Sequence, residues 1–260
     1  MSGELQPNKN YAEMVENCNK LIDRGTFLYS LEKFEEALGC FDEATKINPR
    51  DGDAWTNKGA TLYNLGRFDE ALICFDEANK LSPNISEAWY DKGVILSGLR
   101  RYDDALKCFD KVTKLSPKLV EAWYNKGAVL HKIGKVKESM KCLDEAIKLN
   151  PEYIEVWNLK GAVLLGLGKF NEAVKCFDEA IKINPKFAEA WHNKGLVFHK
   201  LARDDEAIKC YDEAIKINPK YTEAWYNKGA ALQALGKAEE AKKCYDEAIK
   251  IDPRLENPLR

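Results

Sequence analysis

Residues 52–85 read GDAWTNKGATLYNLGRFDEALICFDEANKLSPNI, and close copies of this stretch follow one another along the chain. A tryptophan, a glycine four positions later and a proline near the end of the stretch recur with a spacing of 34 residues. So strict a period indicates an architecture made by stacking one structural unit. We place seven units at 18–51, 52–85, 86–119, 120–153, 154–187, 188–221 and 222–255.

Each unit is predicted to form two antiparallel helices. Trp55, Gly59 and Leu62 fall on one face of a first helix. Ala71 and Phe75 fall on one face of a second helix. No stretch of the chain has the alternation that is typical of strands, so the predicted fold class is all-α.

Glycine and proline mark the ends of these helices. Gly66 is placed to cap the first helix in the left-handed conformation. Pro83 ends the second helix, because the residue before a proline is pushed out of the helical region. Glu32, Arg100 and Ala202 stand at the position of the turn glycine in three other units, so we expect a different local geometry in those turns.

The glycine inside the first helix needs a reason, because it costs about 0.8–1 kcal/mol relative to alanine. We attribute Gly59 to a close approach of the two helices, with the small Ala71 and Ala78 opposite and with Trp55 and Phe75 at the flanks. Layers of this kind cannot be buried within one hairpin. The units must therefore stack on one another.

The pattern Trp-x3-Gly-x2-Leu, followed by Ala-x3-Phe-x2-Ala-x4-Pro, closely resembles the tetratricopeptide repeat. The resemblance covers about nine-tenths of the chain, and the departures are small: Leu21 stands for the first tryptophan and Leu143 for an aromatic residue. It implies a right-handed α-α superhelix, a solenoid of stacked antiparallel helix pairs.

The segments outside the repeats are short. We expect residues 1–17 to form an N-terminal extension that is helical from about residue 11 and continuous with the first repeat. Tyr11, Met14 and Val15 are then expected to shield Phe27. Residues 256–260 are expected to form a C-terminal tail.

The two outer faces of the stack carry lysines where other units have apolar residues. Lys20 precedes the first tryptophan position, and Lys242 lies on the second helix of the last unit. We interpret both as capping substitutions. Because no long capping helix follows Pro253, we also expect Ile249 to stay partly exposed and to favour end-to-end contacts between copies.

Composition limits the classes of function. The chain has 40 basic and 42 acidic residues and a formal charge of −2, which argues against a nucleic-acid-binding protein. No run approaches the roughly 18 apolar residues of a membrane helix, and the N-terminus lacks the pattern of a secretory signal. We expect a cytoplasmic protein that binds neither nucleic acid nor membrane.

Cysteines and histidines give no catalytic or metal signature. Seven of the eight cysteines occupy one site in successive units, too far apart for disulfides, and we expect buried thiols. His131, His192 and His199 do not form a convincing metal-ligand set. Dinucleotide, P-loop and metalloprotease motifs are absent. We predict no enzyme, no metal site and no cofactor.

A charge pattern also repeats. Each second helix carries an aspartate, and the next unit's first helix carries a lysine. One interpretation is an exposed pair within a helix, such as Asp178 with Lys182, worth a few tenths of a kcal/mol. The other is a ladder between units, from Asp42–Lys58 to Asp212–Lys228, with the lysine stems lying over apolar surface.

In tetratricopeptide solenoids the first helices line a concave groove, and the resemblance assigns three rows of side chains to that groove. The acidic row is Asp53, Glu87, Glu121, Glu155, Glu189 and Glu223. The amide row is Asn57, Asn125, Asn193 and Asn227, interrupted by Asp23, Asp91 and Leu159. The aromatic row contains Tyr90, Tyr124, His192 and Tyr226, and Tyr63 is a further aromatic residue assigned to the groove.

These rows predict a protein-interaction adaptor or scaffold that holds a peptide segment of a partner protein in the groove. An asparagine side chain offers one acceptor and two donors, which match the amide of a peptide. The row resembles the asparagine ladder of glycosyltransferase-type tetratricopeptide superhelices. The acids favour a partner that carries Lys or Arg. Extended and helical ligands both remain open.

Two alternatives stay open. The first alternative is a structural assembly unit that uses its ends or its convex face. The second is a co-chaperone that lacks the clamp by which some tetratricopeptide proteins bind a carboxylate. Tetratricopeptide proteins that bind a chaperone's C-terminal carboxylate use a clamp of lysines, asparagines and an arginine. This chain has Glu or Asp where the clamp needs lysine.

Overall fold

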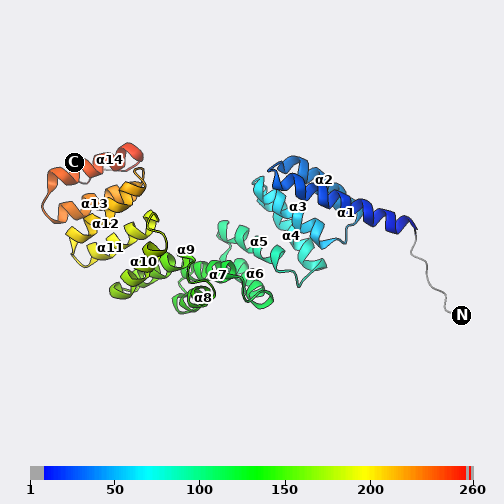
Figure 1. The fold of residues 1–260 in the computed structure, drawn as a ribbon, viewed down its shortest axis with the longest axis horizontal. Coiled ribbons are helices and arrows are strands. Elements are labelled where there is room, and N and C mark those ends of the chain that lie inside the picture. Colours follow the sequence, from blue (N-terminus) through cyan, green and yellow to red (C-terminus); the bar gives the residue numbers. More distant parts are fainter. Residues whose placement is uncertain (1–8, 256–257, 259–260) are drawn as a thin grey trace. The chain divides into compact units, whose positions relative to one another are not determined.

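The computed structural model describes residues 9–255 and residue 258. Within them the chain forms fourteen α-helices joined by short turns, and no strand. The all-α prediction is confirmed. Contacts divide the chain into two compact units, Met1–Ile133 and Gly134–Arg260, which we describe separately. Figure 1 shows the helices of each unit in chain order.

The first unit consists of three hairpins and one further helix. Its helices are α1 (Lys9–Ser30), α2 (Phe34–Ile47), α3 (Gly52–Asn64), α4 (Phe68–Leu81), α5 (Ser86–Gly98), α6 (Tyr102–Leu115) and α7 (Val120–Lys132). The hairpins are α1–α2, α3–α4 and α5–α6, and each second helix also packs on the first helix that follows it. The unit is thus a stack of helix pairs.

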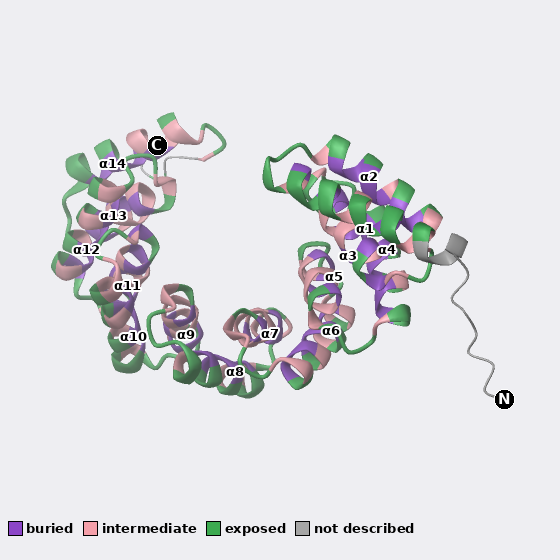
Figure 2. Cartoon of the chain, turned by 45° about the vertical axis from the view of Figure 1, so that its right-hand side comes forward, coloured by how far each residue is buried: buried purple, intermediate pink, exposed green. Residues whose placement is uncertain are grey.

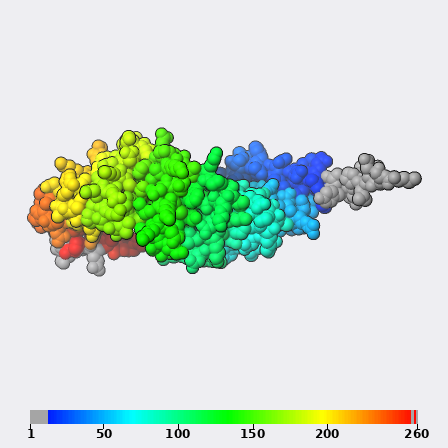
Figure 3. Space-filling view, turned by 90° about the horizontal axis from the view of Figure 1, so that it is seen from below, coloured from blue at the N-terminus to red at the C-terminus, as the bar shows by residue number. Residues whose placement is uncertain are grey.

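The second unit begins with a single helix and continues with three hairpins. Its helices are α8 (Val136–Leu149), α9 (Ile154–Gly166), α10 (Phe170–Ile183), α11 (Ala188–Lys200), α12 (Asp204–Ile217), α13 (Thr222–Ala234) and α14 (Ala238–Ile251). The hairpins α9–α10, α11–α12 and α13–α14 stack as in the first unit. In the space-filling view of Figure 3 the colours follow the chain order within each unit.

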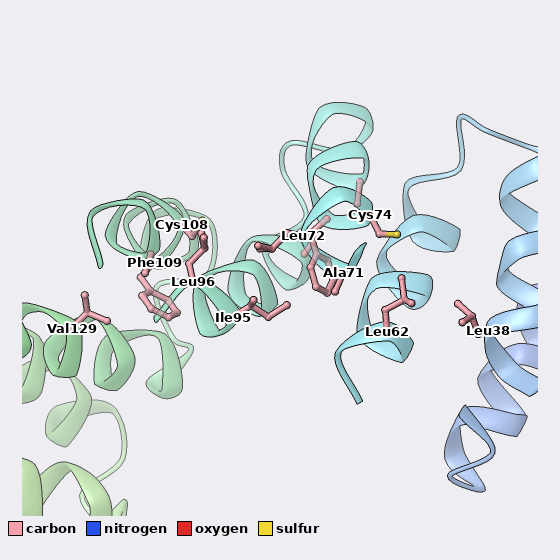
Figure 4. Packing of buried hydrophobic residues seen from close by; sticks show 14 residues of the cluster. Leu38, Leu62, Ala71, Leu72, Cys74, Ile95, Leu96, Cys108, Phe109 and Val129 are labelled. Carbon is pink, nitrogen blue, oxygen red and sulfur yellow. The ribbon is translucent and has the colours of Figure 1, made fainter. Parts of the chain in front are cut away.

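The inner surfaces of the helices form the core. In the first unit, buried side chains from α2 to α7 make one continuous cluster, which includes Leu62, Leu72, Ile95 and Phe109 (Figure 4). Figure 2 shows buried residues on the helix sides that face other helices and exposed residues on the outer sides. Every hairpin therefore depends on its neighbours to cover its apolar face.

The recurrent glycine makes room for an aromatic ring of the second helix. A Cβ atom built on Gly59 would lie 2.8 Å from Cε1 of Phe75, and one built on Gly161 would lie 2.6 Å from Cε1 of Phe177. Real Cβ atoms do not approach a neighbour so closely. Phe75 and Phe177 are fully buried and cannot move out of the way into solvent. The close fit of the two helices at the glycine is confirmed, but the group against Gly59 is the ring of Phe75, which was expected at the flank.

The expectation of different turns at Glu32, Arg100 and Ala202 is wrong. These residues have φ values of 58°, 58° and 54°, the same left-handed conformation as Gly66 with 75°. The hydrogen bonds are also equivalent. The turn at Arg100 is closed by Arg100 N–H to Ser97 O and by the next amide to Leu96 O. The packing of the two helices imposes the turn, at a conformational cost of roughly 1–2 kcal/mol for a residue with a Cβ.

The ladder of ion pairs between successive 34-residue repeats is confirmed. Its six ion pairs are Asp42–Lys58, Asp110–Lys126, Asp144–Lys160, Asp178–Lys194 and Asp212–Lys228, with distances of 2.6–2.8 Å, and Asp76–Lys92. Each lysine amine also lies over the tryptophan of its own helix, at 5.0 Å from the ring centre for Lys58 and Trp55. Lys182, the partner in the alternative interpretation, pairs instead with Glu179 at 3.4 Å.

Two further expectations concern burial. All eight cysteines are buried free thiols, as predicted. Phe27, in contrast, is 63% exposed, so the expected shielding by the N-terminal segment is wrong for the part of that segment whose side chains the structure describes. The side chain of Tyr11 lies outside the described residues. Phe27 occupies the position of the buried Ile95 and Val129, but no preceding hairpin covers it among the described residues.

Candidate functional site

The first helices of the hairpins form one continuous face in each unit, which we call the first-helix face. It is made by α1, α3, α5 and α7 in the first unit and by α9, α11 and α13 in the second. Consecutive first helices contact each other in both units. Consecutive second helices within a unit make no such contact among the described residues. Each unit therefore curves toward its first-helix face.

The amide row lies on this face and is held by hydrogen bonds between repeats. Asn125 Nδ2 donates to the Tyr90 hydroxyl at 2.9 Å, and Asn193 Nδ2 donates to Asn158 Oδ1, also at 2.9 Å. Both asparagines are half-buried. Each uses one N–H in this way, which leaves the other N–H and the side-chain carbonyl for a further partner.

Asn227 has an equivalent bond, to a histidine. Its Nδ2 lies 2.8 Å from Nε2 of His192, whose Nδ1 lies 3.3 Å from the Tyr221 hydroxyl. Burial lowers the pKa of His192, so the ring is neutral at pH 7. The amide therefore donates to Nε2, and Nδ1–H donates to the tyrosine. His192 is buried and positions Asn227 rather than facing solvent.

The other members of the amide row differ. Asn57 is half-buried, and its side chain forms no hydrogen bond with any described residue. Asp91 is also half-buried without such a bond, because the preceding repeat has Thr56, whose hydroxyl turns back to Gly52 O at 2.8 Å. Leu159 is half-buried, and Asp23 is exposed on α1. The row is thus discontinuous, with three fixed amides.

The acidic row lies in the first turn of the first helices. All six carboxylates are exposed, and none forms an ion pair with a described residue: Asp53, Glu87, Glu121, Glu155, Glu189 and Glu223. An acidic residue in the first turn stabilises a helix through the helix dipole. The same row gives each first-helix face exposed carboxylates that no basic side chain of the described residues pairs with.

The aromatic row is only partly accessible. Tyr63 is 40% exposed and its ring lies 5.7 Å from that of Phe68. Tyr90 is half-buried, and burial raises the pKa of its hydroxyl. Tyr124 and Tyr226 are half-buried, and Tyr226 packs on Tyr245 at 5.1 Å.

Sequence reasoning missed the bonds between repeats, although the chain carries a signal for them. Wherever such a bond forms, the residue 35 positions before the asparagine is polar: Tyr90, Asn158 or His192. The same offset joins Asn64 to the Tyr29 hydroxyl at 2.7 Å. A search for matched polar types at this offset would have found the network.

The described part of the chain holds no group of His, Cys, Asp and Glu arranged to bind a metal ion. No helix among the described residues is long and apolar enough to cross a membrane. His199 and Asp204 form a close pair, with 2.5 Å between Nδ1 and Oδ1. This pair joins the end of α11 to the start of α12. His131 lies two 34-residue repeats earlier in the sequence.

Comparison with protein families agrees with this geometry. A tetratricopeptide repeat model matches residues 86–119, 120–153, 188–221 and 222–255. A TPR repeat model matches residues 166–201, and another tetratricopeptide repeat model matches residues 22–86. The chain belongs to the tetratricopeptide repeat (TPR) family. No curated relative matches this TPR chain.

Solved TPR structures resemble the chain over most of its length. A TPR protein from Parabacteroides merdae ATCC 43184 is 15% identical, covers 91% of this chain and 94% of its own, and has a TM-score of 0.74. YrrB, described as a TPR protein with an unusual peptide-binding site, is 26% identical, covers 72% and 97%, and has a TM-score of 0.61. MamA is 24% identical, covers 65% and 92%, and has a TM-score of 0.56. At such identities the first and third comparisons show the fold alone.

Proposed function

We propose that this TPR protein is an adaptor or scaffold that binds peptide segments of partner proteins on the first-helix faces of its units. The observation that carries the proposal is the set of three fixed amides, Asn125, Asn193 and Asn227. Their side chains are ordered before a ligand arrives, so binding loses little side-chain entropy. Each retains an acceptor and a donor, the two groups that pair with a peptide bond.

Charge supports a basic ligand. The acidic row adds an exposed carboxylate on each first helix from α3 to α13, with no ion-pair partner among the described residues. A ligand with Lys or Arg would be attracted to this face, mainly through a faster association rate. The printed description of YrrB as a peptide-binding TPR protein is in keeping with the proposal. We also propose that the protein acts in the cytoplasm and without catalysis of its own.

Selection from a random peptide library, followed by binding assays on the purified chain, tests this proposal. One variant changes Asn57, Asn125, Asn193 and Asn227 together to alanine. The matched control changes four exposed residues on second helices without altering the net charge: Glu43, Glu138, Lys175 and Lys209, all to alanine. We expect the asparagine variant to lose the selected peptides while the control retains them. Equal binding by both variants, with both folded, contradicts the proposal.

Self-association is a second candidate, favoured by one observation. Phe27 and Leu31 are 63% and 52% exposed at the end of α1. An exposed apolar patch is suited to contact with another copy. Sedimentation velocity at rising concentration would show larger species for the parent and none for Phe27→Ser. A concentration-independent monomer for the parent rules out this role.

A further inference from the structure

A pocket of about 280 Å³ opens between the second and third repeats of the first unit. It is lined by Tyr63, Phe68, Val94, Ile95, Gly98 and Leu99. Tyr63, Phe68 and Leu99 are 40%, 40% and 43% exposed, so the apolar lining is open to solvent. The lining is apolar apart from the Tyr63 hydroxyl, which forms no hydrogen bond with a described residue.

The preceding joint differs from this one at the position of Gly98. Between the first and second repeats, Asn64 stands at the position of Gly98 and donates its Nδ2 to the Tyr29 hydroxyl at 2.7 Å. One repeat later Tyr63 replaces Tyr29, but Gly98 replaces Asn64. A Cβ built on Gly98 meets nothing within 4 Å. Without a side chain at Gly98, the Tyr63 hydroxyl has no hydrogen-bond partner among the described residues. The first joint also has a pocket, of about 270 Å³, against the equivalent Phe34 and Leu65, but the rest of its lining is charged, whereas the pocket at Gly98 is apolar.

The pocket continues into a negatively charged stripe on the same helix. Glu87, Asp91, Val94 and Gly98 follow one another on α5 at intervals of four, three and four residues, so they share one face. Asp91 is half-buried with no hydrogen-bond or ion-pair partner among the described residues. Burial, together with the nearby Glu87, raises the pKa of Asp91 to about 6.

Asp91 is costly for the fold. Burying a carboxylate without a partner lowers stability, and four of the other repeats have asparagine at this position. A basic group from a ligand would supply the missing partner.

We propose that this pocket and Asp91 form a two-point docking site for a peptide that carries a large apolar residue and, about three residues away, a Lys or Arg. The apolar side chain enters the pocket, and the basic side chain pairs with Asp91 and Glu87. The spacing follows from geometry: Asp91 and Gly98 are seven helix residues apart, about 10 Å along the axis, which an extended peptide spans with about three residues. The inference rests on the proposed function, and it names the ligand class.

Blocked, fluorescein-labelled peptides of Gly and Ser with one Lys and one Leu three positions apart test the site by fluorescence polarisation with the full chain. Control peptides carry Gln for Lys, Ser for Leu, or a separation of six. We expect the first peptide to bind at least about tenfold more tightly than the controls, since loss of an anchor residue typically has an effect of this size. A parent protein that binds all four peptides alike overturns the proposal.

Two variants locate the binding. Gly98→Asn inserts the side chain that binds the tyrosine hydroxyl at the joint between the first two repeats, and we expect about a tenfold loss of affinity. Asp91→Asn installs the residue of other repeats and is expected to abolish the preference for Lys over Gln, which a purely structural role would not change. Gly166→Asn is the matched control, at the equivalent position in the fifth repeat and with nothing within 4 Å of a built Cβ.

Unchanged binding by Gly98→Asn and Asp91→Asn overturns the docking site. That result is distinguishable from failure of the proposed function. If only the docking site fails, library-selected peptides still depend on the four asparagines of the amide row. If the proposed function itself fails, the selected peptides bind the four-asparagine variant as well as they bind the parent.

Discussion

Replacing Gly59 by alanine tests why a glycine recurs inside every first helix. The new Cβ would lie 2.8, 2.9 and 3.0 Å from three ring atoms of Phe75, which is fully buried. Alanine adds about 1 kcal/mol of helix propensity, but overpacking a filled core costs about 1–3 kcal/mol. We expect Gly59→Ala to lower the free energy of unfolding by up to about 2 kcal/mol.

Gly39 provides the matched control. It lies inside α2, and nothing stands within 4 Å of a Cβ built there, so Gly39→Ala should stabilise by about 1 kcal/mol. Urea unfolding followed by far-UV circular dichroism measures both variants, which are compared at equal m-value. Adding Phe75→Leu should rescue part of the loss in Gly59→Ala, since Leu143 occupies this position in the fourth repeat. Equal stabilisation by the two alanines would falsify the close-approach explanation.

Four further outcomes follow from the structure. Ala202→Gly should raise the free energy of unfolding by roughly 1 kcal/mol, because Ala202 has a φ of 54°. A double-mutant cycle with Asp178→Asn and Lys194→Met should give a coupling of about 0.5 kcal/mol, since the carboxylate is half-exposed. Burial raises the pKa of Cys176 to about 11, so a disulfide reagent at pH 8 should modify it only on unfolding. With the pKa of Asp91 at about 6, the folded chain binds more protons than the unfolded chain between about pH 4 and 6. The urea midpoint of unfolding should therefore fall as the pH rises from about 4 to 6, and it should fall less in Asp91→Asn.

Each of these outcomes has a control. Gly236→Ala, at a φ of 74°, should destabilise by an amount similar to the gain from Ala202→Gly. The ion-pair coupling should weaken in 1 M salt, because screening is then strong. Denaturant should bring the modification rate of Cys176 to that of a free thiol. A fall in urea midpoint that is the same in the parent and in Asp91→Asn would mean that another group causes it.

Much of the fold could be predicted because every unit repeats the same constraints. Gly59 with Phe75, and Asp178 with Lys194, follow from positions that recur at one spacing. The turns were misjudged because residue type was taken to decide the conformation. Arg100 adopts the left-handed conformation since the hydrogen bonds and packing of its hairpin leave no alternative.

The candidate site was harder to predict because it depends on the register between repeats. The amide row could be read from the sequence, but its fixation through Tyr90 and His192 needs to be seen in space. The free hydroxyl of Tyr63 beside the pocket depends on a single difference, Gly98 in place of Asn64. A search for what repeats share passes over such differences.

The most direct test of the central claim is a crystal structure of the chain with the tightest peptide from the library selection. We expect the peptide on the first-helix face, with its backbone N–H and C=O groups within about 3.2 Å of the side-chain amides of Asn125, Asn193 or Asn227. A peptide bound on the second helices, or at the exposed end of α1 near Phe27, would contradict the account.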